Sequence, residues 1–210
     1  MAEITVDCSA NYSAARSIFV YGSMTEGFVH FDKIKEFVEE QNYASIAGSA
    51  YLLKVGFPVV LAEGLDVIPG QLMKLKDNSL LWQLLDQFHG YHEQIPTKSL
   101  YFRQSIDVRL QNGETVRAET YFLNPSKLPS SAKLISGGDW RCVQQEKPLT
   151  EKLTDRQRSY ILRLGTSIGR EIVPIDLPLY RELMNLEMIV DKGRRLALSK
   201  LGHEVYRYLA

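Results

Sequence analysis

The chain has 210 residues, of which 45% are hydrophobic and 24% are charged, and its formal net charge is zero. This composition is typical of a soluble globular protein with one large domain or one domain plus a small appendage. The balanced charge gives no long-range field that would steer the chain onto nucleic acid or an anionic membrane. Only two cysteines are present, Cys8 and Cys142, and their spacing indicates neither a disulfide framework nor a cysteine-ligated zinc site.

No apolar run approaches the roughly 18 residues that a membrane span needs, and the first residues lack the pattern of an export signal. We therefore expect a cytoplasmic protein without a membrane partner.

The first elements in chain order alternate between strand and helix patterns. The run "SIFVY", residues 17–21, predicts a buried strand that stops at Gly22-Ser23. The run "FDKIKEFVEEQN" predicts a short amphipathic helix over residues 31–42 with Asp32 as its cap. From Ala44 to Leu75 the period changes to two, which predicts strands joined by short turns at "GFP", "AEG" and "IPG".

A second helix and a hairpin follow. The run "SLLWQLLDQFHG" has helical spacing, begins after Asn78-Ser79 and ends at Gly90, a residue suited to the left-handed position after a helix. Alternating residues on both sides of Asn112-Gly113 predict a β-hairpin with a type I′ turn. Residues 124–150 are rich in Pro, Ser, Gly and Lys, which predicts a long surface connection with a domain boundary near Lys147–Leu149. The expected domains are therefore residues 1–147 and 148–210.

The module from Pro148 onward has the order helix, helix, hairpin, helix. Thr154 and Gln157 have capping-box spacing, Asp176 is placed to cap the next helix, and the hairpin is expected to turn at Asp191–Gly193. This order resembles a winged-helix module.

The second helix of this module is a poor match to a DNA-recognition helix. It carries Arg181 and Asn185, but Glu182 and Glu187 would repel phosphate. Two basic residues at the expected wing, Arg194 and Arg195, are more often a solvated edge. The pattern therefore favours packing or homo-oligomerisation through this module over nucleic-acid binding.

Four motifs resemble the gamma-glutamyl cyclotransferase-like family in their order and spacing over roughly residues 17–125. They are "FVYGSM", "AGSAYLLKVGFPVV", "IPGQLMKL", and "LLDQFHGY" followed by "YFRQSIDVRL". The resemblance implies an α+β fold in which a mixed sheet closes into a small barrel with helices around it. It also implies a transferase-type activity that releases 5-oxoproline from a gamma-glutamyl compound. We expect neither a cofactor nor a metal.

The same resemblance implies the substrate-binding residues. In the family, the loop that matches Tyr21, Gly22, Ser23 and Met24 presents backbone N–H groups to the carboxylate of a gamma-glutamyl group. Glycine lets the backbone approach a ligand closely, and consecutive amides attract an anion without a cationic side chain.

Two tyrosines of the predicted hairpin complete this set. Tyr101 shares a face with Arg103, and Tyr121 lies on the partner strand. Tyr101 and Tyr121 are predicted to bind the ligand, and core packing with a bonded hydroxyl is the alternative for Tyr121.

The family uses a glutamate as catalytic base in the pattern Leu-Asp-x-x-Glu-Gly, and this chain has His89 at the glutamate position. A carboxylate accepts a proton and also attracts the substrate ammonium, whereas neutral imidazole only accepts the proton. The end of a helix raises a histidine pKa and desolvation lowers it, so the sequence leaves the charge of His89 open. Glu93 is a poor replacement because it follows the break at Gly90, and this break also argues against a metal site with His92.

Two classes of function follow. The first is an enzyme, or a relic of one, that acts on a gamma-glutamyl compound. The second is a non-catalytic protein whose barrel binds a small ligand or none and whose module from Pro148 mediates interaction. The missing negative charge at position 89 favours loss of the standard activity.

Overall fold

The computed structural model describes residues 17–76, 78–143, 147–167 and 171–210. Cys8 lies outside these ranges, and Cys142 is an exposed free thiol. The chain divides into two compact units, of which the second begins at Glu146 and also takes in Lys54–Gly56. None of the helices in the described ranges is long and apolar enough to cross a membrane.

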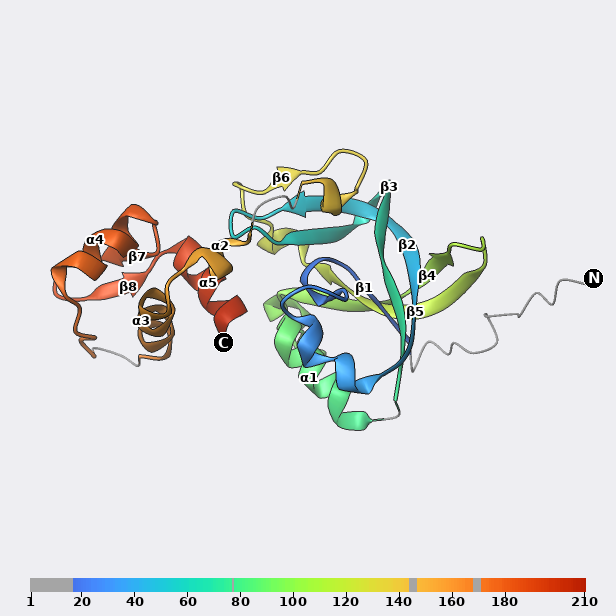
Figure 1. Cartoon of the computed structure of the whole chain (residues 1–210), viewed down its shortest axis with the longest axis horizontal. Helices are drawn as coiled ribbons and strands as arrows, with labels where there is room; N and C mark the ends of the chain where they lie inside the picture. The colour runs from blue at the N-terminus through green and yellow to red at the C-terminus, as the bar shows by residue number, and fades with distance from the viewer. Residues whose placement is uncertain (1–16, 77, 144–146, 168–170) are drawn as a thin grey trace, which may run out of the picture. The chain divides into compact units, whose positions relative to one another are not determined.

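Five strands of the first unit close into a barrel (Figure 1). They are β1 (Ser17–Val20), β2 (Val38–Leu52), β3 (Pro58–Leu75), β4 (Tyr101–Leu110) and β5 (Thr115–Leu123). The order is β3-β1-β5-β4-β2, and pairing of β2 with β3 closes the ring. Strand β1 runs parallel to β5, while the other neighbours are antiparallel. The predicted α+β fold with a closed mixed barrel is confirmed.

Alternation along the strands separates two apolar clusters. Phe19 faces the barrel interior, whereas its neighbours Ile18 and Val20 face outward. The outward residues pack against Leu81 and Leu85 of helix α1 (Ser79–His89). This helix begins where the Asn78 side chain accepts a hydrogen bond from the Leu80 amide, and it ends at Gly90 with φ +59°, both as predicted. Its packing holds the end of α1 against the outer face of the barrel.

The helix predicted over residues 31–42 is wrong. Two 3-10 helices, η4 (Phe31–Lys33) and η5 (Lys35–Phe37), lead directly into β2, and the capping position belongs to His30. From Val38 onward the backbone pairs with β3, and this non-local pairing overrides the local helical pattern. The apolar face itself is correctly predicted, because Ile34 is buried in the cluster beneath α1.

The predicted turns at "AEG" and "IPG" are also wrong, since β3 runs through both. The register changes where Gly48 pairs with Asp66 and Ser49 pairs with Leu61, so the extra β3 residues form a bulge. A Cβ on Gly70 would lie 2.3 Å from the Val20 carbonyl oxygen. This glycine therefore serves the close approach of β1 and not a turn.

The β4–β5 hairpin forms as predicted, but its turn is not type I′. That turn needs positive φ at both central residues, whereas Glu187 is the only non-glycine residue with positive φ in the described ranges. The Gly113 amide donates to the Leu110 carbonyl at 3.1 Å, and Gly113 has φ +89°. A single left-handed glycine after the turn matches the three-residue loop with a G1 bulge.

Much of the predicted surface connection is packed structure. It contains η7 (Pro125–Lys127), strand β6 (Lys133–Leu134) beside β2, and η8 (Trp140–Cys142). Trp140 is 2% exposed, and its indole N–H donates to the Pro69 carbonyl at 2.8 Å. Because a buried tryptophan bonds to the barrel wall, this segment belongs to the first unit, and most of its other residues are exposed, as the predicted surface connection requires.

The second unit combines short helices with a small hairpin. Its elements are α2 (Leu149–Lys152), α3 (Asp155–Thr166), α4 (Leu177–Asn185), β7 (Ile189–Asp191), β8 (Leu196–Leu198) and α5 (Lys200–Leu209). Thr154 and Gln157 form the predicted capping box, and Asp176 accepts from the Leu179 amide. The β7–β8 hairpin is also as predicted, whereas α2 was not predicted. The likeness to a winged-helix module stays a prediction.

Candidate functional site

His89 is the last residue of α1, and its imidazole is half-buried. Its Nδ1 lies 2.9 Å from the Leu85 carbonyl oxygen. Because a carbonyl only accepts hydrogen bonds, the neutral ring carries its proton on Nδ1 and has its lone pair on Nε2. The helix backbone thus fixes which nitrogen can accept a proton.

Burial lowers the pKa of His89 to about 4. The hydrogen bond to Leu85 acts in the opposite direction, and the nearby His30 lowers the pKa further. Of the two opposing effects expected from the sequence, desolvation is therefore the larger. His89 is a neutral imidazole at pH 7.

Aromatic rings surround this imidazole. The ring of Tyr121 stacks on it, with centroids 3.8 Å apart and an interplanar angle of 3°. Phe88 and Tyr101 approach it edge-on, with centroid distances of 5.0 and 5.4 Å. His30 contacts Phe88 in turn at 5.0 Å. The enclosure accounts for the strong desolvation of the ring.

Tyr121 is held by a salt-bridged carboxylate. Its hydroxyl donates to Asp86 at 2.6 Å, and Arg103 donates to both oxygens of the same carboxylate at 3.0 and 2.9 Å. We call Asp86, Arg103 and Tyr121 the clamp. Burial and the Asp86 carboxylate raise the pKa of Tyr121, so its hydroxyl stays protonated as a donor. The clamp therefore fixes the ring that lies against His89.

The arginine of the clamp, Arg103, also contacts two aromatic rings and a second carboxylate. Its guanidinium lies over the rings of Trp82 and Tyr91, both at 5.3 Å, and 3.9 Å from the Glu119 carboxylate. Burial lowers the pKa of Arg103, but Asp86, Tyr121 and Glu119 together raise it by more. The pair is about three-quarters buried, with side-chain exposures of 22% for Arg103 and 24% for Asp86.

The loop after β1 forms the 3-10 helix η3 (Gly22–Met24). Gly22 has φ +61°, and a Cβ there would lie 2.7 Å from Cγ of Pro58, so both the backbone and the packing require glycine. The Ser23 carbonyl accepts from the His30 amide at 2.9 Å. The role of the Gly22 and Ser23 N–H groups in binding a carboxylate stays a prediction. Met24 is buried in the cluster beneath α1.

Tyr21 connects this loop to His89. Its hydroxyl donates to the Tyr121 carbonyl at 2.9 Å and accepts from the Val60 amide at 3.3 Å. Contacts thus connect three of the predicted site residues, Tyr21, Tyr101 and Tyr121, with His89. The rings of Tyr101 and Tyr121 contact His89, whereas the hydroxyl of Tyr121 is engaged by Asp86.

Sequence reasoning missed the clamp and His30. Asp86 lies one helical turn before His89, and Arg103 pairs with Tyr121 across the hairpin, so helix and strand spacing contained a signal for the clamp. No pattern pointed to His30. His92 lies beyond α1, where its amide donates to Ser99 Oγ. The described ranges hold no group of three His, Cys, Asp or Glu side chains suited to a metal ion.

A scan against protein-family models matches residues 18–142 to the family described as "Gamma-glutamyl cyclotransferase, AIG2-like". The chain belongs to this family. The match takes in every residue assigned above to the candidate site and ends before α2, so α2 and the elements that follow it lie outside the cyclotransferase-like domain.

Several solved structures are similar to the chain. YkqA from Bacillus subtilis is 24% identical with a TM-score of 0.45, and the alignment covers 61% of this chain and 40% of that one. An AIG2-like protein from Mus musculus is 16% identical with a TM-score of 0.43, over 55% of this chain and 80% of that one. The chain thus spans less than half the length of YkqA. A search of curated protein sequences found no match.

Proposed function

We propose that the cyclotransferase-like domain binds a small gamma-glutamyl or related amino-acid compound and lacks the standard cyclotransferase activity. The observation that carries this proposal is the neutral, desolvated imidazole of His89. The resemblance in sequence assigns the family's catalytic glutamate to this position. Three properties of the site support it: an anion-binding loop, the proton affinity of His89, and its missing charge.

The loop supports binding. Gly22 has φ +61°, and an added Cβ would lie 2.7 Å from Pro58, so this loop requires glycine at the position whose N–H we assign to the ligand carboxylate. Such amides bind a carboxylate without a competing cation. A ligand carboxylate on these amides would leave the amine end of the compound to interact with the aromatic enclosure of His89.

The lost activity follows from both proton affinity and charge. Burial lowers the pKa of His89 to about 4, and the same burial would raise the pKa of a glutamate at this position above its ordinary value of about 4.3. His89 is therefore the weaker base. The two groups also differ in their attraction for the substrate ammonium, which for a unit-charge pair about 4 Å apart is worth about 4 kcal/mol near a protein surface. Neutral His89 supplies none of it.

The nearest carboxylate does not replace this charge. Asp86 lies one turn before His89, but both of its oxygens are bonded to Arg103 and one also accepts from Tyr121. Its charge is balanced by the guanidinium within the clamp. The site is thus suited to holding a neutral or carboxylate-bearing ligand more than to stabilising an ammonium.

The test measures release of 5-oxoproline from a panel of gamma-glutamyl amino acids and amines, with the same compounds titrated by calorimetry. We expect binding without turnover by the native protein and a gain of turnover in His89→Glu. His92→Glu is the matched control, because it adds the same charge at a nearby histidine and should remain inactive.

Two outcomes would overturn the proposal. Robust turnover by the native protein that disappears in His89→Ala would make His89 the base. No binding and no turnover in either the native protein or His89→Glu would leave a non-catalytic interaction role as the better account.

A further inference from the structure

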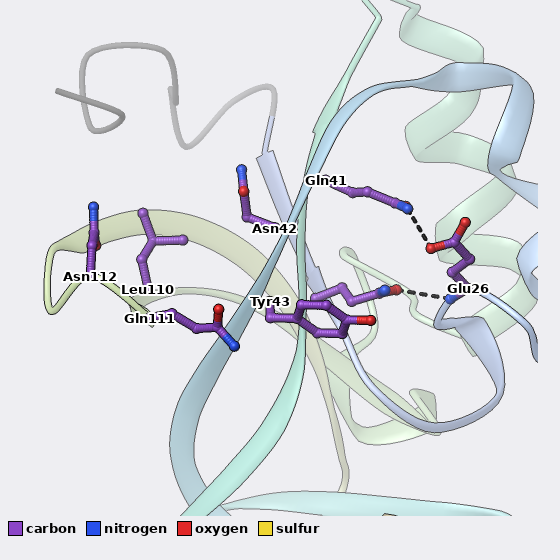
Figure 2. A pocket seen from close by; sticks show the side chains of 8 residues that line it. Glu26, Gln41, Asn42, Tyr43, Leu110, Gln111 and Asn112 are labelled. Carbon is purple, nitrogen blue, oxygen red and sulfur yellow. Dashed lines mark hydrogen bonds between the residues drawn. The ribbon is translucent and has the colours of Figure 1, made fainter. Parts of the chain in front are cut away.

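A cavity lies in the first unit, lined by residues that take no part in the contacts of His89. Its volume is about 320 Å³, within the range of about 300–1,000 Å³ typical of small-molecule sites. Figure 2 shows side chains from β2, from the turn after β4 and from the loop after η3 gathered around it. Most of the lining is carboxamide, from Gln41, Asn42, Gln71, Gln111 and Asn112.

The lining excludes several classes of ligand. It contains no Lys, Arg or His, so it does not suit phosphate or another anion. A single leucine is its only aliphatic side chain, so it does not suit a lipid chain. The one carboxylate, Glu26, accepts a hydrogen bond from the side-chain amide of Gln41 at 2.6 Å.

The polar groups of the wall are held in place. The Glu26 amide donates to Oε1 of Gln71 at 2.8 Å, and this bond together with the bond from Gln41 to Glu26 is drawn in Figure 2. Oε1 of Gln41 is buried and has no hydrogen-bond partner among the described residues. A buried acceptor of this kind is costly unless a donor reaches it. Gln41 Oε1 therefore lacks a hydrogen-bond donor.

Tyr43 adds an apolar surface to this polar wall. It is 62% exposed, and Figure 2 shows it between the Gln111 side and the Glu26 side of the cavity. An exposed aromatic ring offers a flat face to a ligand with a C–H surface, while its hydroxyl stays available for hydrogen bonding. A carboxamide carries two N–H groups and two acceptor lone pairs, so bonds within the protein leave capacity for hydroxyl groups that both donate and accept. Asn112 makes such bonds with Glu114, and Gln71 accepts one from the Glu26 backbone N–H.

We propose that this cavity binds a neutral saccharide unit, with its ring face on Tyr43 and its hydroxyl groups on the surrounding carboxamides. A sugar combines an apolar ring face with a dense set of neutral hydroxyl groups, which are the two features that this lining complements. The proposal goes beyond the proposed function and does not depend on it, because the two sites share no residue.

The test is an NMR titration of the full chain with glucose, galactose, mannose and N-acetylglucosamine, each into the millimolar range. We expect at least one sugar to give saturable shift changes confined to Gln41–Tyr43 and Leu110–Asn112. Tyr43→Ala should weaken this binding at least about tenfold, which is about 1.4 kcal/mol, whereas Tyr43→Phe should keep most of it. Gln83→Ala, at an exposed position of α1, is the matched control and should bind normally.

Three results would overturn the proposal. The first is the absence of localised shifts with all four sugars. The second is unchanged affinity in Tyr43→Ala. The third is saturable binding of choline or of a short alanine peptide at these residues when none of the sugars binds, because it would assign the cavity to a cationic or peptide ligand.

Discussion

The imidazole of His89 lies parallel to the ring of Tyr121, with centroids 3.8 Å apart. The hydroxyl of Tyr121 is anchored 2.6 Å from Asp86, so the stacked pair depends on a hydrogen bond at the far edge of the tyrosine. Position 89 is therefore controlled by residues on α1, β4 and β5 together.

Tyr121→Phe is expected to lower the free energy of unfolding by about 1–2 kcal/mol, because the largely buried Asp86 carboxylate loses one donor while the ring stays in place. Chemical denaturation measures the loss. Tyr43→Phe removes a hydroxyl from an exposed ring and serves as the control, with no expected change. Equal stabilities for the two variants would contradict the assigned role of the Tyr121 hydroxyl.

Arg103→Met is expected to destabilise the protein by about 1–3 kcal/mol, since it leaves Asp86 without its bidentate partner in a largely buried setting. The control is Arg117→Met, which breaks an ion pair with Asp107 whose side chains are 58% and 68% exposed. This exposed pair should contribute less than about 1 kcal/mol. A larger loss in the control than in Arg103→Met would show that the clamp adds nothing to stability.

The folded-state pKa of His89 is lowered from 6.5 to about 4, which makes stability depend on pH. The unfolded chain binds more protons between these values, so this contribution is fully present above pH 6.5 and declines as the pH falls toward 4. The total loss is at most about 3 kcal/mol. The free energy of unfolding, measured by denaturation at several pH values in this window, should fall less steeply with decreasing pH for His89→Gln than for the native protein.

Direct titration of His89 by NMR provides a second reading of the same effect. A midpoint near 4 is expected from the burial of the ring. A midpoint near 6.5, or denaturation curves of equal slope for the native protein and His89→Gln, would show that the ring is solvated.

Gly22→Ala is expected to be the most damaging change in the loop after β1. The substitution forces alanine into positive φ, at about 1–2 kcal/mol, and also places Cβ 2.7 Å from Pro58. Gly27→Ala isolates the backbone effect, because Gly27 has φ +87° with nothing within 4 Å of the added Cβ. Thermal unfolding should show the larger loss at Gly22, and a larger loss at Gly27 would count against the close packing of this loop.

Local signals in the sequence predicted those elements whose ends are determined locally. Asn78 and Gly90 bound α1 through their own conformations, so its limits were predictable. The segment over residues 31–42 had an equally clear helical pattern, but pairing between Val38 and Leu75 decides its structure. A pairing between positions this far apart leaves no trace in the local pattern.

The residues of the candidate site were also predictable only where local signals determine them. Motif order identified His89 and the loop from Tyr21 to Met24, and spacing placed Tyr101 and Arg103 on one face. The charge of His89 was not predictable, because it depends on how completely Phe88, Tyr101 and Tyr121 exclude water. Burial is a property of the assembled fold and not of any short stretch of chain.

The position of β1 in the barrel has a consequence for the order of folding. It lies between β3 and β5, and these strands belong to two hairpins, β2–β3 and β4–β5, that can each form from nearby residues. The pairing of β1 with β5 joins Ile18 and Glu119, which are about a hundred residues apart in the sequence. Contacts between residues so far apart form slowly. During synthesis, β1 emerges before either hairpin and must wait for β5. The two hairpins should therefore form first, and insertion of β1 should be the step that seals the barrel.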